Sequence, residues 1–190
     1  MKDLVLLSGG VDSLVIAEQS RRRGELCGLV FVDMAHPSQI KEGWKAFSYH
    51  GEKQIPLKAL HVFGLNLGDM ANPTGAAVVP SRNMVLLSVA QNVASEFGAT
   101  RILIGCNKTD EADYQDCRRG SLEIASQAFV AMGGIPVVAP LIEFDKTEIM
   151  RMAADLGISE NDFWSCYQNT AKPCGECNSC LEIRKCLTAD

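Results

Sequence analysis

Residues 4–13 read Leu4-Val5-Leu6-Leu7-Ser8-Gly9-Gly10-Val11-Asp12-Ser13, and this stretch decides the fold of the 190-residue chain. Its four apolar residues predict a buried strand, and the segment Leu14–Arg23, which a glycine follows, predicts a helix. Two glycines between strand and helix permit a tight turn whose N–H groups converge on an anion. We therefore expect a phosphate site formed by Leu7, Ser8, Gly9, Gly10, Val11, Asp12, Ser13 and Leu14.

Asp12 has two candidate roles in this loop, because a carboxylate does not bind phosphate directly. It either caps the following helix or helps to hold a bound Mg²⁺. No lysine follows the glycines, which excludes the Walker type of phosphate loop. An ordinary Gly-Gly turn closed by Asp12 or Ser13 is the alternative interpretation.

The composition, with 47% hydrophobic and 22% charged residues, is typical of a globular domain with a substantial core. A net charge of −5 argues against stable, charge-driven binding to nucleic acid. No apolar run is long enough to span a membrane, and no signal peptide is evident. Eight cysteines in such a chain indicate a reducing cytoplasm, where clustered thiols are metal ligands more often than disulfides.

Apolar runs alternate with segments of helical period along the chain. This alternation predicts an α/β fold of the Rossmann-like type, a parallel sheet with helices on both faces. Residues 1–160 are assigned to this nucleotide-binding domain and residues 161–190 to a cysteine-rich segment. The expected strands are Leu4–Leu7, Leu26–Val32, Ala59–Phe63, Arg101–Gly105 and Pro136–Pro140, and the expected helices are Asp12–Arg23, Ser38–Glu52, Ser81–Phe97, Ser121–Met132 and Lys146–Leu156, the last opened by Asp145 and Glu148 as a capping box.

Four cysteines near the C-terminus, Cys166, Cys174, Cys177 and Cys180, follow the pattern C-x7-C-x2-C-x2-C. Such spacing lets two sulfurs of a tight turn and two more from nearby residues surround one ion as a tetrahedron. Zinc in a structural role is the first interpretation, because four thiolates leave no position for water. An iron–sulfur cluster is the alternative.

The N-terminal Ser-Gly-Gly-x-Asp-Ser resembles the motif of the pyrophosphate-loop ATPases, which have the adenine nucleotide alpha hydrolase-like fold. Members split ATP between its α and β phosphates, transfer AMP to a substrate oxygen and release pyrophosphate. Three more stretches, 79–83, 113–118 and 165–180, narrow the resemblance to the 7-cyano-7-deazaguanine synthases of queuosine-precursor biosynthesis. The match is collinear from Leu4 to Arg184.

This resemblance implies an ATP-dependent C–N ligase that converts 7-carboxy-7-deazaguanine and ammonia into the nitrile. It implies two ATP per product, adenylated intermediates, an amide on the way, Mg²⁺ with the ATP, and a homodimer. The residues it assigns to charge stabilisation in catalysis are Arg82, Lys108 and Arg118, and those it assigns to substrate binding are Asn83, Asp110, Asp113, Tyr114 and Asp116. The Arg fork suits carboxylate and phosphate alike.

Simpler interpretations exist for these stretches. Arg82 and Asn83 can merely open a helix with Ser81 as its cap. The segment 113–119 can be a solvated, charge-balanced loop.

Cys117, beside two arginines, is a candidate nucleophile with a lowered pKa.

The chain departs from the family pattern at Val11, Ser81, Asp113, Gln115 and the stretch Asp33–Gln39. It is also shorter than typical members of the family, notably between Leu65 and Val78, and we interpret the loop Gly64–Ala77 as a trimmed substrate lid. The product can therefore be the amide, or the substrate another carboxylate or a tRNA. A non-catalytic metal-ribbon interaction module is a further alternative.

Overall fold

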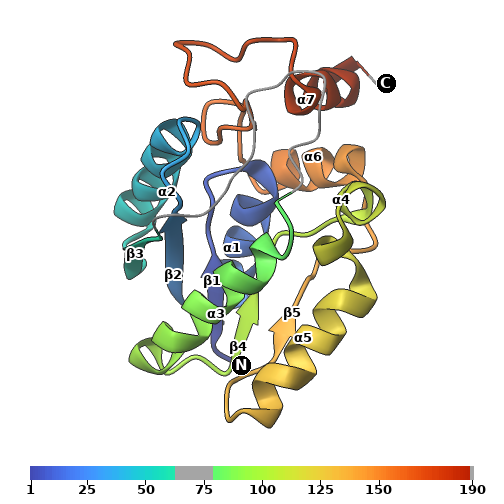
Figure 1. Cartoon of the computed structure of the whole chain (residues 1–190). Coiled ribbons are helices and arrows are strands. Elements are labelled where there is room, and N and C mark those ends of the chain that lie inside the picture. The colour runs from blue at the N-terminus through green and yellow to red at the C-terminus, as the bar shows by residue number, and fades with distance from the viewer. Residues whose placement is uncertain (63–78, 189–190) are drawn as a thin grey trace.

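The computed structural model describes residues 1–62 and 79–188. One sheet contains five parallel strands, in the order β3-β2-β1-β4-β5 (Figure 1). They are β1 (Asp3–Leu6), β2 (Leu26–Asp33), β3 (Leu57–His61), β4 (Arg101–Leu103) and β5 (Val137–Val138). The chain runs outward from β1 to β3, then returns to add β4 on the other side of β1. The carboxyl end of β1 therefore lies at the switch point where parallel sheets bind ligands.

Two buried layers cover the sheet, because successive residues of a strand point to opposite faces. Leu4 and Leu6 of β1 belong to one layer, and Val5 and Leu7 belong to the other. The helices α3 (Arg82–Ala94) and α5 (Arg119–Ala131) cover the first layer, and α1 (Val11–Arg22), α2 (Gln39–Lys53) and α6 (Lys146–Asp155) cover the second. This arrangement confirms the predicted Rossmann-like α/β fold.

The predicted elements are confirmed, with shifted ends. β3 begins two residues earlier than expected, at Leu57, and the helix expected to reach Phe97 ends as α3 at Ala94, followed by a 3-10 turn, Ser95–Phe97. Two helices were not predicted, α4 (Lys108–Asp113) and α7 (Asn178–Thr188). The short, charged α4 lacks the periodic apolar residues that predict a helix. The start of α7 overlaps the cysteine motif, which we interpreted as a metal site and not as a helix.

The capping box of α6 is confirmed. The Asp145 carboxylate accepts from the N–H of Glu148 at 2.9 Å, and the Glu148 carboxylate accepts from the N–H of Asp145 at 2.8 Å. This cap places Lys146 in the first turn of the helix. The predicted lid, Gly64–Ala77, and the predicted strand end Phe63 lie outside the described residues. Among the helices that are described, none has the length and apolarity to cross a bilayer.

Candidate active site

A bend at the end of β1 forms the floor of the site. Gly9 has a φ of +89°, and a Cβ added there would lie 2.1 Å from the carbonyl oxygen of Glu42. A residue other than glycine is therefore excluded twice, by backbone conformation and by the close approach of α2. Gly10 occupies the N-cap of α1, so the expectation that Asp12 caps this helix is wrong.

Serine hydroxyls fix the shape of the bend. The Ser13 hydroxyl accepts from the N–H of Ser8 at 3.2 Å and donates to the carbonyl of Gly10 at 2.9 Å. The N–H of Gly10 in turn donates to the Ser8 hydroxyl at 3.2 Å. The first N–H groups of α1 point out of the same bend, because no preceding turn supplies their acceptors. Together with the helix dipole, this is the geometry of an anion site.

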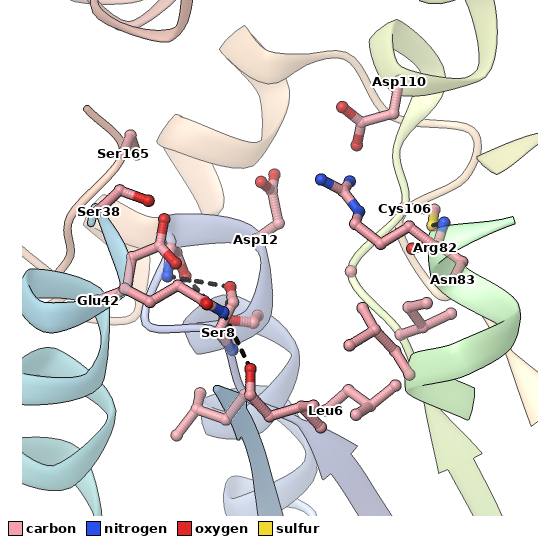
Figure 2. Close-up of a pocket in the computed structure, with 18 of the residues that line it drawn as sticks. Leu6, Ser8, Asp12, Ser38, Glu42, Arg82, Asn83, Cys106, Asp110 and Ser165 are labelled. Atoms are coloured by element: carbon pink, nitrogen blue, oxygen red, sulfur yellow. Dashed lines mark hydrogen bonds between the residues drawn. The ribbon is translucent and has the colours of Figure 1, made fainter. Parts of the chain in front are cut away.

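A pocket of about 290 Å³ opens beyond the bend, above the carboxyl ends of β1, β2 and β4 (Figure 2). Apolar side chains such as Val32 and Met34 form part of its lining and polar groups form the rest. A floor for phosphate beside an apolar wall suits a nucleotide or a flat heterocycle.

Lys146 forms an ion pair with Asp12 in the pocket. Its ammonium donates to both oxygens of the Asp12 carboxylate, at 2.7 and 2.9 Å. Desolvation lowers the pKa of Lys146, but the charges of Asp12 and Asp110 raise it by more. Burial and the charge of Asp12 raise the pKa of Asp110 to about 6, although Lys146 opposes them. Two carboxylates thus share one cation.

Glu42 and His36 line the opposite side of the pocket. Burial raises the pKa of Glu42 to about 7, against the opposing charge of Arg82 and a hydrogen bond from Ser38. Burial and the charge of Arg82 lower the pKa of His36, whose Nδ1 accepts from the N–H of Ser38 at 3.2 Å. Figure 2 shows Glu42 beside Ser38 and the bend, with Arg82 across the cavity and directed toward Asp110.

Only some of the site residues predicted from the sequence line the pocket. Arg82, Asn83, Asp110 and Tyr114 line the pocket, whereas Lys108 and Arg118 are exposed and are not among its lining residues. Asp113 ends α4.

Asp116, in the 3-10 turn Gln115–Cys117, contacts the start of α3 with its side chain. Its carboxylate accepts from the N–H of Asn83 at 2.9 Å. Ser81 occupies the N-cap position of α3 but makes no capping bond with its side chain. The role first considered for Ser81 thus falls to Asp116.

A pair of cysteines forms part of the pocket wall near Asn83. Cys106 and Cys117 are buried, and the Asn83 amide lies 3.5 and 3.2 Å from their sulfurs. The neighbouring thiol of Cys117 and burial raise the pKa of Cys106. The interpretation of residues 113–119 as a solvated loop is therefore wrong for Cys117. Its proposed role as a nucleophile stays a prediction.

The four predicted metal ligands meet at one point. Their sulfur atoms all lie within 4.8 Å of one another, and those of Cys174 and Cys180 are 3.9 Å apart. A tetrahedral ion with sulfur ligands at about 2.3 Å requires sulfurs about 3.8 Å apart, so the cluster can hold a metal ion. Backbone N–H groups of Gln168 and Cys174 donate to the Cys166 sulfur at 3.3 Å, which favours a thiolate.

The cysteine segment also forms one wall of the pocket. Its contributing residues are Trp164, Ser165, Tyr167, Ser179 and Glu182. The N–H of Trp164 donates to the carbonyl of Gly9 at 3.0 Å, which ties the segment to the bend. Burial and the neighbouring Tyr114 raise the pKa of Tyr167.

Sequence reasoning missed Glu42, Lys146 and Trp164 as site residues. Glu42 lies in an ordinary amphipathic helix, and Lys146 follows a capping residue, so neither has a local signal. Trp164 directly precedes the Ser-Cys-Tyr stretch that carried part of the family resemblance, and that position was the available signal.

The sheet, its strand order and the glycine bend match the adenine nucleotide alpha hydrolase-like fold that the sequence predicted. Similar solved structures include the U34-tRNA thiolase NcsA from Methanococcus maripaludis with its 4Fe–4S cluster, at a TM-score of 0.54 and 17% identity over 84% of this chain and 57% of that one. The NMN synthetase from Francisella tularensis also has a TM-score of 0.54, at 14% identity over 85% of this chain and 63% of that one. At these identities the likeness concerns the fold alone.

The chain belongs to the family described as "Queuosine biosynthesis protein QueC", whose family model matches residues 2–189. The protein named 7-cyano-7-deazaguanine synthase in Trichodesmium erythraeum is 32% identical over 95% of this chain and 92% of its own length. Proteins of the same name in Chlorobium phaeobacteroides and Thermoplasma acidophilum are 33% and 31% identical, over 95% of this chain and 89% and 84% of their own lengths. This chain therefore belongs to a family of synthases in queuosine biosynthesis, as its sequence motifs predicted.

Proposed function

We propose that the protein converts 7-carboxy-7-deazaguanine and ammonia into 7-cyano-7-deazaguanine at the expense of two ATP. One observation carries this proposal: in a member of this family, the glycine bend with its converging N–H groups opens directly into a half-apolar pocket. The bend fits a pyrophosphate leaving group, and the pocket beyond it fits a purine-like ring.

The chemistry requires activation twice. A carboxylate oxygen is a poor leaving group, so the substrate oxygen attacks the α-phosphorus of ATP and pyrophosphate leaves. Ammonia then displaces AMP to give the amide. The amide oxygen attacks a second ATP, and loss of AMP and of the remaining N–H protons leaves the nitrile. In this proposal Arg82, which lines the pocket, stabilises charge on the carboxylate or the phosphoryl group.

Mg²⁺ would accompany the ATP, and the carboxylates that fit it are Asp12 and Asp110. Both line the pocket next to the bend, and the charge of Lys146 acts on both of them. A divalent cation bound by phosphate oxygens and one or two carboxylates would relieve this excess of negative charge. Its chemical contribution is to neutralise the charge that develops on the pyrophosphate.

The four-cysteine site, we infer, holds structural Zn²⁺. The separation of its sulfurs matches tetrahedral zinc, and four thiolates leave no coordination position for substrate. Anaerobic purification followed by metal analysis tests this. One zinc per chain is the expected result, whereas a brown protein containing iron would establish an iron–sulfur cluster instead.

The direct test of the reaction is incubation with 7-carboxy-7-deazaguanine, ammonium, ATP and Mg²⁺, followed by mass spectrometry of the products. We expect the nitrile, with two pyrophosphates released per product. Accumulation of the amide alone would show that the reaction stops at the first activation. If neither product forms and no pyrophosphate is released, the proposal is wrong.

Two arginine variants test which arginine side chains take part in the reaction. Arg82→Ala should decrease kcat/KM at least 100-fold, because Arg82 projects into the pocket. Arg118→Ala should retain activity within about twofold, because Arg118 is exposed and is not among the lining residues. An equal loss in both variants would support the role that the family resemblance assigned to Arg118.

A third variant tests Cys117. Cys117→Ser with normal turnover would exclude covalent catalysis by that thiol.

A further inference from the structure

The proposed reaction releases protons that a group in the pocket must accept. When ammonia attacks the acyl adenylate, its nitrogen bonds to the acyl carbon and loses a proton on the way to the amide. A side chain that accepts this proton during the attack accelerates such a step about 10²- to 10⁴-fold. The acyl carbon is joined to the α-phosphorus through a single oxygen, so this base belongs close to the glycine bend.

The acidic side chains on one side of the pocket surround Lys146. Its ammonium forms an ion pair with Asp12, and the charges of Asp110 and Glu182 also act on it. Asp12 and Asp110 are also the carboxylates that fit Mg²⁺. A carboxylate that stabilises a cation is less free to accept a proton, so the base has to be sought elsewhere in the pocket.

His36, on the opposite side of the pocket, is excluded as the base. Its Nδ1 accepts a hydrogen bond from the backbone N–H of Ser38 at 3.2 Å, and a backbone N–H can only donate. The proton of the neutral ring is therefore on Nε2, which leaves neither nitrogen free to accept another. Burial and the charge of Arg82 lower the pKa of His36, so the ring stays neutral.

Glu42 lies on the same side as His36 and is fixed at the bend. Its backbone carbonyl is the group against which Gly9 packs. The residue is partly buried and lines the pocket beside Ser38, with Arg82 across the cavity (Figure 2). Its carboxylate can therefore be reached from the cavity.

The surroundings of Glu42 make its carboxylate a stronger base than usual. The Ser38 hydroxyl bonds to it, and Arg82 is the charged group of the described residues that acts on it. Burial outweighs both and raises the pKa of Glu42 to about 7. A general base works best when its pKa lies near the working pH.

We propose that Glu42 is the general base of the amide-forming step, accepting the proton that the ammonia nitrogen loses as it bonds to the acyl carbon. The bond from this carbon to the AMP oxygen breaks, AMP leaves with the electron pair, and Glu42 passes its proton to solvent before the next turnover. This inference rests on the proposed function. It makes Glu42 a catalytic residue on α2, a helix that carries none of the site residues predicted from the sequence.

Glu42→Gln removes the base while keeping the shape of the side chain. Glu52→Gln is the matched control, because Glu52 is exposed on the same helix and is not among the lining residues of this pocket. Adenylation is measured without ammonium, as exchange of labelled pyrophosphate into ATP in the presence of 7-carboxy-7-deazaguanine. Amide formation is measured by mass spectrometry after ammonium is added. In Glu42→Gln, amide formation should fall at least about 100-fold more than exchange does, whereas Glu52→Gln should match wild type in both assays.

Hydroxylamine provides a second readout. It is a much weaker base than ammonia, so it is largely unprotonated at neutral pH, and after its attack the nitrogen loses a proton readily to water. Glu42→Gln should therefore form the hydroxamate at a rate within about tenfold of wild type, which a general distortion of the site would not allow.

The pH dependence provides a third readout. In wild type, kcat/KM for unprotonated ammonia should rise as the pH increases through about 7, because Glu42 becomes ionised. Glu42→Gln should lack this rise. Any rise that both proteins share arises from other groups of the pocket, such as Asp110, whose pKa is about 6.

The outcomes separate this proposal from the proposed function. Equal losses of exchange and amide formation in Glu42→Gln would show that Glu42 only shapes the site. Normal amide formation, an equal loss with hydroxylamine, or an unchanged pH profile would likewise refute its role as a base while the bend remains an ATP site. If Glu42→Gln does not fold, Glu42→Asp replaces it: its carboxylate lies one carbon further from the nitrogen, so amide formation should again fall more than exchange. If wild type shows neither exchange nor amide, the proposed function itself fails.

Discussion

Replacing Gly9 by alanine tests the geometry on which the phosphate site depends. The backbone at Gly9 has a φ of +89°, which costs a residue with a Cβ about 1–2 kcal/mol. The new Cβ would also lie 2.1 Å from the Glu42 carbonyl, so the bend and α2 must separate by about 1 Å to reach even a tight contact. A displacement of about 1 Å at a catalytic site can cost about 100-fold in rate.

Gly24 is the matched control for this variant. It follows the other end of α1 with a φ of +69°, and an added Cβ there meets no atom within 4 Å. Gly24→Ala should therefore lose about 1–2 kcal/mol of unfolding free energy in urea but keep its kcat/KM. Gly9→Ala should lose more stability and at least 100-fold in kcat/KM for pyrophosphate release. Nearly normal turnover of Gly9→Ala would refute the assignment of the bend as the phosphate site.

Three further predictions concern charge and metal. Glu42 has a pKa of about 7 in the folded protein against 4.5 as its ordinary value, so the folded state keeps a proton that the unfolded chain has lost between those pH values. Glu42 should contribute at most about 3 kcal/mol to a fall in the unfolding free energy of the ligand-free protein across this window, beside the contribution of Asp110, whose pKa is raised to about 6. Glu42→Gln should make the fall smaller, as urea titrations at pH 4 and 8 would show; an equal fall in wild type and Glu42→Gln would contradict this. Lys146→Met should lower unfolding free energy at pH 7 by about 2 kcal/mol because its half-buried carboxylate partner, Asp12, loses this cation, whereas Lys108→Met, at an exposed site, should change it by less than about 0.5 kcal/mol. Cys174→Ser should lose the bound metal in elemental analysis while Cys186→Ser retains it, and equal metal content would place the ion elsewhere.

Local sequence determined the strands, most helices and the bend. The alternation of Leu4 to Leu7 between two faces follows from the period of a strand, and the start of α6 follows from Asp145 and Glu148 three residues apart. Such signals lie within one element, so they can be seen without knowing what packs against it. The spacing of the cysteines is a local signal as well, because a tight turn brings its thiols together without any contact from distant segments.

The composition of the pocket depended on tertiary structure instead. Lys146 reaches Asp12 across 134 residues of sequence, and Trp164 reaches Gly9 across more than 150. Lys108 was the lysine expected in the site, but α4 turns it to solvent while the cap of α6 places Lys146 in the pocket. Which charged side chain enters a site depends on how the helices pack over the sheet. Packing arises from contacts between distant segments, and such contacts leave no periodic trace in either segment alone.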